Sequence, residues 1–339
     1  MAAETTGKNQ SARQIFPPRH RAFVYQALLA AALVLAAGYF ISNAIENLLA
    51  RRIASGFAFL SREAGFEIGE TTLLAYSASD SYLRALAIGL LNTFRIALPA
   101  ILFSSLIGSA LGLARLAPNW LLAKLASAYV EVIRNVPLIV QLFFWYAVIT
   151  ESLPPPAHAL RPLPGVFLSN RGFAFPTLMA KFPVALDYPS LSGFNFSGGG
   201  SLSPEFAALF LGLTLYTAAF IGEIVRAGIL SVDRGQFEAA RSVGLNGRQV
   251  MRFVIVPQAL RVIVPPVTSQ YLNCTKNSSL AVAIGYPDLV AIANTTINQT
   301  GQAIEGVAII MLVYLAISLA ISGLMNWYNA RIALRGAQS

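Results

Sequence analysis

The sequence has few charged residues and few of the residue types that build soluble enzymes or metal sites. Charged side chains make up 12% of the 339 residues and hydrophobic ones 56%, whereas an ordinary soluble domain has about 25% charged residues. Its one cysteine, Cys274, excludes an intrachain disulfide. The two histidines, His20 and His158, lie far apart and have no metal-ligand spacing. No Ser/His/Asp or Cys/His arrangement indicates catalysis, so we expect neither an enzyme nor a metal site.

A phosphate-binding loop is also missing. The pattern G-x-x-x-x-G-K-[ST] does not occur, and Gly7–Lys8 is followed by asparagine rather than by serine or threonine. The chain is therefore not itself an ATPase, and we expect it to bind no cofactor. Its net charge of +9 does not indicate nucleic acid, because membrane proteins concentrate Lys and Arg in their cytoplasmic loops.

The first apolar run has no small-residue cleavage site after it and is read as a retained helix.

Long apolar runs recur along the chain and predict an all-α integral membrane protein rather than a β-barrel. A helix needs about 20 apolar residues to cross a bilayer. We expect about six transmembrane helices, and the second helix should begin near Arg84. The expected spans are 23–42, 96–114, 127–150, 205–225, 252–273 and 305–326. The fifth is interrupted by Pro257, Arg261 and the pair Pro265–Pro266.

Basic residues indicate how these spans are oriented. With a cytoplasmic N-terminus, the cytoplasmic pieces hold fourteen Lys and Arg and the longer external loops hold eight. Because cytoplasmic loops are the more basic ones, both termini are expected in the cytoplasm. The cytoplasmic pieces are 1–22, 114–135, 226–252 and 327–339, and the external loops are 43–84, 154–204 and 274–304.

The two large external segments differ in kind. Residues 43–84 include RRIASGFAFLSREAGFEIGE, a mixed-charge stretch with helical spacing, whereas 154–204 is rich in Pro, Gly and Ser. Both segments can either pack on the external face or serve only as linkers.

The charged stretch EAARSVGLNGRQV (238–250) stands between two apolar runs. Just before it, Asp233 is a typical N-cap with Gln236 at the third helical position, which is a capping-box pattern. The helix that it predicts, 234–243, ends at Gly244, a typical residue after a helix C-terminus. At 1.5 Å per residue this helix is about 15 Å long and cannot cross a membrane.

The same signals repeat at once. Asn246 is an N-cap and Gln249 is its third-position partner. The stretch therefore predicts a helix, a tight turn and a second helix. Phe237, Ala240 and Gly244 share one stripe of the first helix. An ordinary surface loop would also fit this pattern if nothing further distinguished it.

The wider stretch EAARSVGLNGRQVMRFVIVP resembles the EAA loop in the membrane subunits of ABC importers. It reads EAA, three residues, Gly, nine residues, an aliphatic, one residue, an aliphatic and Pro. The aliphatic positions are Val254 and Val256, where Ile and Leu are more usual. Three further runs are similar to the polar amino-acid permease branch, which includes the histidine and glutamine permeases. They are AYVEVIRNVPLIVQLFFWY (128–146), GEIVRAGILSVDRGQFEAA (222–240) and KNSSLAVAIGYPDL (276–289).

The resemblance covers about 84–330 and implies a type I ABC importer core of five helices. The extra N-terminal helix and external segment, 23–83, and the 154–204 insertion resemble the longer subunits of general L-amino-acid transporters. The resemblance also implies the domain plan: cytoplasmic tails 1–22 and 331–339, and an EAA loop at 231–252. It implies a multi-pass subunit in the inner membrane of a bacterium.

The resemblance further implies partners and a coupling site. In this family the loop's short helix docks on a cytoplasmic ATPase dimer, which uses the ATP. A second homologous permease subunit and an external amino-acid-binding protein are also implied. The residues expected to couple to the ATPase are Phe237, Glu238, Ala239, Ala240 and Gly244, and the small Ala239 and Ala240 would allow close approach.

Polar residues inside spans indicate where a solute could pass. Arg95 is expected to snorkel to the external surface, and Glu223 and Arg226 are spaced to pair with each other. The fifth span has prolines that weaken its hydrogen bonds, and a broken helix can offer polar groups to a zwitterion. The solute-path residues expected there are Gln270, Asn273, Lys276, Asn277, Ser278 and Ser279. A solvated external loop is the alternative for this cluster.

Two other functions remain open from the sequence. An ion-gradient-driven secondary amino-acid transporter would be expected to have paired carboxylates in the middle of its spans, which these spans lack. A membrane anchor or scaffold with no solute path would tolerate loss of the polar residues in the fifth span.

Overall fold

The computed structural model describes residues 18–50, 56–71, 73–178 and 186–334, and the chain divides into two units at Ser55. In the first unit, α1 (Pro18–Ala50) is helical throughout. In the stretch Phe23–Asn43, the most apolar 18-residue window has a mean hydropathy of 2.0 and no buried residue. It is long enough to cross a bilayer, as the sequence predicts.

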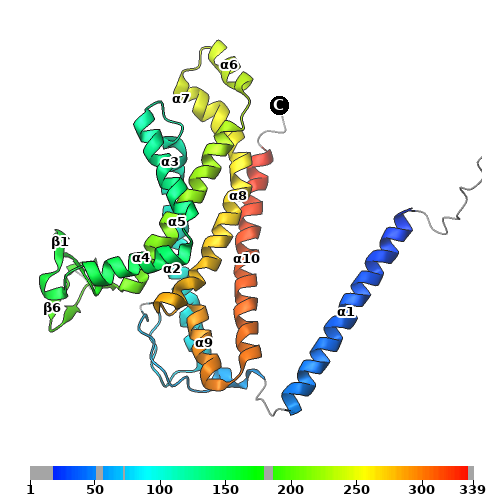
Figure 1. Ribbon diagram of the computed structural model, residues 1–339, viewed down its shortest axis with the longest axis vertical. Helices are drawn as coiled ribbons and strands as arrows, with labels where there is room; N and C mark the ends of the chain where they lie inside the picture. Colours follow the sequence, from blue (N-terminus) through cyan, green and yellow to red (C-terminus); the bar gives the residue numbers. More distant parts are fainter. Residues whose placement is uncertain (1–17, 51–55, 72, 179–185, 335–339) are drawn as a thin grey trace, which may run out of the picture. The chain divides into compact units, whose positions relative to one another are not determined.

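Four long helices organise the second unit: α2 (Tyr82–Ala114), α5 (Pro204–Leu230), α8 (Val256–Asn277) and α10 (Ala303–Leu334). Helix α5 packs along α2 and also contacts α8, and α10 packs on α8 (Figure 1). The described helices include five that could each cross a membrane, or six if one bent pair is counted as a span. The predicted helical membrane architecture is confirmed.

The bent pair corrects the predicted third span, which was one helix over 127–150. The chain instead bends by 104° between α3 (Trp120–Asn135) and the helical stretch Leu138–Ser152, which begins with α4 (Leu138–Ala147). The cause is Pro137, which lacks an N–H and disfavours helical geometry in the residue before it. Val136 is accordingly extended, with φ −96° and ψ 126°. The Gln141 side chain donates to the carbonyls of Ile133 (2.9 Å) and Val136 (3.0 Å), which stabilises the elbow.

The fifth span also differs from its prediction, because the prolines do not break it. A π-helical turn, η4 (Val250–Ile255), leads into α8, and a 3₁₀ turn, η5 (Ser278–Ile284), follows without a gap. Pro265 and Pro266 remove only two N–H donors, and both lie on the exposed face of the helix. Membrane helices tolerate proline where local adjustments satisfy the freed carbonyls.

Residues 56–71 and 73–81 form an ordered segment that is mostly irregular, so the predicted helical spacing there was misleading. Its one helical turn is η1 (Phe57–Ser61). Phe59, Ala64 and Ile68 are buried in a cluster with the start of α2 and with α9 (Leu289–Thr300). The segment is therefore packed against the helices and is not a linker.

The insertion after α4 likewise has a structure of its own. It begins with a π turn, η2 (Val148–Ser152), and a 3₁₀ turn, η3 (Pro156–His158). A four-stranded antiparallel sheet follows in the order β1-β2-β3-β8, with two small hairpins, β4-β5 and β6-β7. The strands are β1 (Leu160–Leu163), β2 (Val166–Ser169), β3 (Gly172–Phe175), β4 (Thr177–Leu178), β5 (Leu186–Asp187), β6 (Ser190–Ser192), β7 (Asn195–Ser197) and β8 (Gly200–Leu202). The linker alternative for 154–204 is wrong.

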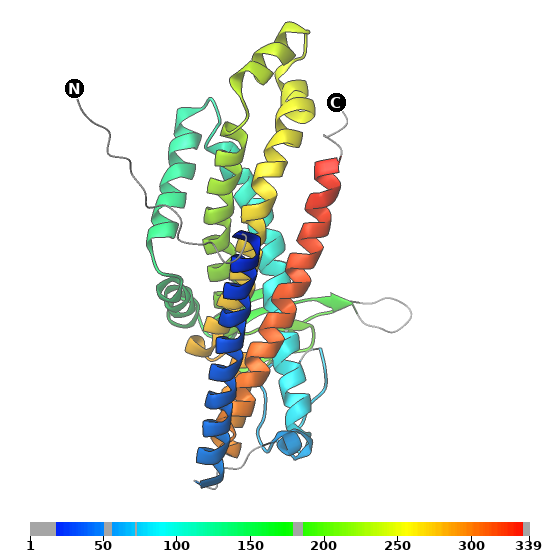
Figure 2. The same ribbon diagram turned by 90° about the vertical axis from the view of Figure 1, so that its right-hand side faces the viewer.

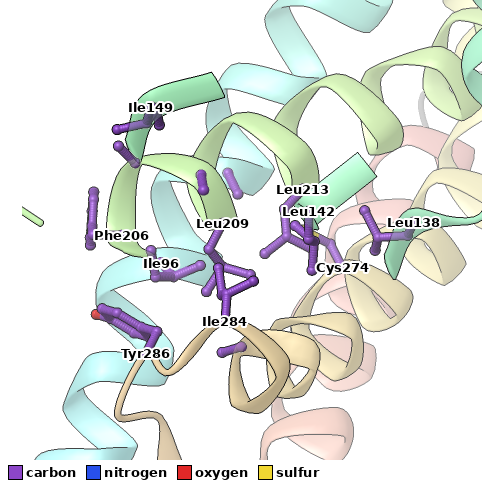
Figure 3. Close-up of a cluster of buried hydrophobic side chains, with 14 residues drawn as sticks. Ile96, Leu138, Leu142, Ile149, Phe206, Leu209, Leu213, Cys274, Ile284 and Tyr286 are labelled. Atoms are coloured by element: carbon purple, nitrogen blue, oxygen red, sulfur yellow. The ribbon is translucent and has the colours of Figure 1, made fainter. Parts of the chain in front are cut away.

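The main core lies where α2, α4, α5 and η5 meet, as Figure 3 shows. Leu142, Leu209 and Leu213 are each 0% exposed and point toward one another there. Tyr286 closes one side of the cluster, and its ring lies 6.0 Å from that of Phe206. This packing holds α4 and the start of α5 beside the end of α8.

Candidate functional site

The charged island forms the helix–turn–helix that its caps predict, at one end of α5 and α8 (Figures 1 and 2). The first helix, α6 (Arg234–Ser242), begins after Asp233, whose carboxylate accepts from Gly235 N at 2.6 Å. The predicted capping box with Gln236 is wrong. The Gln236 side chain instead lies 3.5 Å from the side chain of Gln258, at the start of α8.

The turn after α6 is closed as the glycine pattern predicts. Gly244 has φ +89° and donates to the Arg241 carbonyl (2.9 Å), while Leu245 N donates to the Ala240 carbonyl (3.2 Å). These two bonds form a Schellman motif. Asn246 then caps α7 (Gly247–Gln249) with both bonds of a capping box, at 2.9 and 3.0 Å. The second predicted cap is therefore confirmed.

The structure separates the predicted coupling residues into an inner and an outer set. Ala240 is 6% exposed and packs on Val250 and Ile255, so it joins α6 to η4 and is covered within this chain. The outer set, Phe237, Glu238, Ala239 and Gly244, is exposed. Val243, which sequence reasoning did not select, is 76% exposed and adds an apolar contact point at the C-terminal end of the same helix. The predicted stripe Phe237–Ala240–Gly244 thus does not face outward as one surface.

The polar face of α8 carries most of the predicted solute-path residues. Asn273 and Lys276 are exposed, and Gln270, Asn277 and Ser279 are half-buried. Ser278 does not belong with them, because it is 0% exposed and donates its hydroxyl to the Thr275 carbonyl at 2.7 Å. The loop alternative is wrong, since this stretch is helical throughout.

Toward the island the exposed face of α8 is mixed, because Val262, Pro265 and Pro266 are exposed among the polar positions. Arg261 and Ser269 are exposed on the same side as Asn273 and Lys276, at spacings that keep residues on one helix face. The most apolar 18-residue window of Gly247–Ile284 has a mean hydropathy of 1.5, against 2.5 for that of Ala303–Arg331. Polar groups at membrane depth are costly against lipid. The α8 face therefore suits water or another protein chain rather than acyl chains.

A charged cluster near the island end of α5 was only partly predicted. The predicted Glu223–Arg226 pair is present at 2.6 Å. Arg115, at the end of α2, also donates to Glu223, and Arg134 of α3 lies 4.0 Å from the same carboxylate. Sequence reasoning missed these two arginines because they are remote from Glu223 in the chain.

Arg95 does not snorkel as expected. Its guanidinium pairs with Glu70 at 2.5 Å and lies over the Phe206 ring, 4.8 Å from the ring centroid. Asn92, one turn earlier in α2, donates to the carbonyls of Glu70 (2.9 Å) and Pro287 (3.0 Å). These contacts fasten the 56–81 segment to α2, α5 and the start of α9.

These features define a helical membrane subunit with an exposed helix–turn–helix at one end and polar residues along one face of α8. Residues 100–334 match the family model described as "Binding-protein-dependent transport system inner membrane component", and the chain belongs to that family.

Individual relatives agree with that family. The chain is 45% identical to YhdX of Escherichia coli (strain K12), whose name describes an amino-acid ABC transporter permease, over 94% of this chain and 95% of that protein. It is 41% identical to the General L-amino acid transport system permease protein AapQ of Rhizobium johnstonii, over 94% of each. Among solved structures it resembles "Crystal structure of an amino acid ABC transporter with histidines", with a TM-score of 0.54 and 27% identity, over 74% of this chain and 95% of that one.

Proposed function

We propose that this chain is the membrane-spanning permease subunit of an ATP-driven importer that moves amino acids across the inner membrane of a bacterium. The carrying observation is the exposed, doubly capped helix–turn–helix in a chain that has no phosphate-binding loop of its own. Its relatives' names support the amino-acid solute and the permease role. None of those relatives supports the ion-gradient alternative.

Each partner is assigned to an exposed surface of the chain, in keeping with the family to which the chain belongs. The outer set of α6 meets a cytoplasmic ATPase dimer, which binds and hydrolyses the ATP. The polar face of α8 meets a second, homologous permease subunit, and the two faces enclose a water-filled path. An external binding protein delivers the amino acid at the opposite end. The chain itself is a transport subunit and not an enzyme.

The direct test is uptake in proteoliposomes that hold this chain, its partner permease and the binding protein, with and without the ATPase. ATP-dependent accumulation of an amino acid only in the presence of the ATPase is the expected result. Accumulation driven by an ion gradient in vesicles without the ATPase would contradict the proposal.

Topology gives a first prediction. A reporter fused after Ser339 should be cytoplasmic, and one inserted near Gly199, between β7 and β8, should be external. The reason is the excess of basic residues on the side of the island and the two termini. Accessibility labelling of both fusions in whole cells measures this. Both reporters on one side of the membrane would contradict the six-span topology.

The α8 face gives a second prediction. Asn273→Ala and Lys276→Ala should each lower the rate of uptake about tenfold or more while the complex still assembles, because a lost hydrogen bond to a charged group costs about 1.5–3 kcal/mol. Asn326→Ala is the matched control, since Asn326 is exposed on the more apolar α10. Parental uptake in both α8 variants, measured with several amino acids, would place the solute path elsewhere.

A further inference from the structure

The Glu223 cluster has more positive charge than its single carboxylate can pair. Arg115 donates to Oε2, and Arg226 donates to Oε1 at 2.6 Å and to Oε2 at 3.4 Å. Both carboxylate oxygens are thus occupied by two arginines. Arg134, the third arginine, lies 4.0 Å from Oε2, which is too far for a hydrogen bond. Three guanidinium groups and the Glu223 carboxylate sum to about +2 at ordinary pH, and the exposed Glu131, three residues before Arg134 on α3, lowers that sum.

Arg134 is held in place without having its donors used. Its guanidinium carbon lies over the Phe220 ring of α5, 5.0 Å from the ring centroid. Its side chain is 39% exposed. Within the described part of the chain, no side-chain or backbone acceptor forms a hydrogen bond with it. A guanidinium has five N–H donors, and leaving them unpaired away from bulk water is costly.

The cluster lies near the island end of α5, where the predicted spans meet the cytoplasmic pieces 114–135 and 226–252. Glu223 precedes the end of α5 at Leu230 by seven residues, which corresponds to about 10 Å along the helix. Around Arg134, α3 exposes Glu131 and Asn135. Such polar side chains would be unfavourable against acyl chains. This part of α3 therefore borders water at the cytoplasmic end of the spans, where a solute leaving the path would pass.

We propose that Arg134 binds the carboxylate of the transported amino acid on the cytoplasmic half of the path. This inference rests on the proposed function and adds a residue and a chemical group to it. The planar fork of an arginine matches a carboxylate with two parallel hydrogen bonds. Every α-amino acid carries that carboxylate whatever its side chain, so the site serves a permease of broad specificity. Arg115 and Arg226 keep Glu223 from neutralising Arg134 and so leave its donors to the solute.

The same oxyanion chemistry would accept the phosphate of an anionic phospholipid, so the test must separate the two sources. The complex of both permease subunits and the ATPase is placed in nanodiscs without the binding protein. Binding of L-glutamine, L-glutamate and L-arginine is compared with that of their α-carboxamides, which lack the carboxylate. Nanodiscs of phosphatidylcholine alone and nanodiscs with phosphatidylglycerol form the two lipid arms.

The parent complex should bind an amino acid at least about tenfold more tightly than its amide, as expected for a charge-assisted hydrogen-bonded pair. Arg134→Gln should reduce that ratio to near one in both lipids, and Arg134→Lys, which keeps the charge without the fork, should restore part of it. Lys124→Gln removes an exposed charge from the same helix and should leave the ratio parental. Because Glu223 keeps its two bonded arginines, Arg134→Gln should assemble normally.

A parental ratio in Arg134→Gln would overturn the inference. So would an effect of the substitution that appears only with phosphatidylglycerol, because Arg134 would then be a lipid site. If Arg134→Gln fails to assemble, the Arg134→Lys ratio decides: a parental value overturns the inference and a reduced one supports it. ATP-driven uptake by the parent complex is measured in parallel. ATP-driven uptake that does not distinguish amino acids from their α-carboxamides would contradict this inference alone. A complete lack of ATP-driven amino-acid uptake would contradict the proposed function as well.

Discussion

Replacing Gly244 by valine should release the ATPase from the permease while the membrane spans stay folded. Gly244 has φ +89°, a conformation that costs a residue with a side chain about 1–2 kcal/mol. No atom lies within 4 Å of the position where a Cβ would be added, so the effect is strain in the turn and not a clash. Relief of that strain would break the bonds from Gly244 and Leu245 that set the angle between α6 and α7. We expect recovery of the ATPase with the purified permease to fall about tenfold, since 1.4 kcal/mol corresponds to a factor of ten.

Gly247→Val is the matched control for this effect. Gly247 begins α7, also has open space at its Cβ position, and does not have a left-handed backbone. It should retain parental ATPase recovery and uptake. If Gly244→Val accumulates normally, keeps the ATPase and transports at the parental rate, then the shape of the island does not matter for coupling.

Charge on the outer set of α6 can be tested independently of its shape. Glu238 is exposed and can be reversed to lysine without loss of a buried contact. Glu238→Lys should weaken ATPase recovery, as Gly244→Val does, if a basic group of the ATPase faces it. If the parent and Glu238→Lys recover the ATPase equally, then docking depends on the apolar side chains of the outer set and not on the charge at position 238.

The island shows what kind of structure the sequence can predict. Its caps, its closing glycine and its second capping box depend on residues within a few positions of one another, and four of the five predicted coupling residues are exposed. Ala240 is the exception, because its burial depends on Val250 and Ile255 in the next element. A helical stripe gives one face of a helix but does not say whether the chain itself covers that face.

Contacts between segments that are distant in the chain could not be predicted from the sequence for the same reason. Glu70 pairs with Arg95 across an irregular segment, and Arg115 reaches Glu223 from another helix. No periodicity connects such residues. The elbow at Pro137 did have a local signal, since proline disfavours a helix before it. An uninterrupted apolar run outweighed that signal in the sequence and led to one straight span where there are two helices.

The last and largest effect is expected where α2 and α5 touch. Ser104, Gly108 and Gly112 recur every four residues of α2 and are buried, a small-residue stripe of the kind that lets membrane helices approach closely. A Cβ on Gly108 would lie 2.7 Å from the Cβ of Ile221 and 2.8 Å from the Ala218 carbonyl oxygen. The neighbours are backbone and a β-branched side chain, and neither can move away without separating the helices. Overpacking of this kind costs about 1–3 kcal/mol or more.

Gly108→Val should therefore abolish the folded subunit, and Gly108→Ala should reduce its abundance in the membrane by a smaller factor. Gly323→Val makes the same change in α10, where nothing lies within 4 Å of the added Cβ, and should leave abundance unchanged. Quantified membrane fractions and size-exclusion profiles of the purified complex measure both effects. Unlike Gly244→Val, the loss should extend to the permease itself and not only to its ATPase. Parental abundance of Gly108→Val would mean that α2 and α5 do not pack this closely in the membrane, and the position of Arg115 beside Glu223 would have to be reconsidered with it.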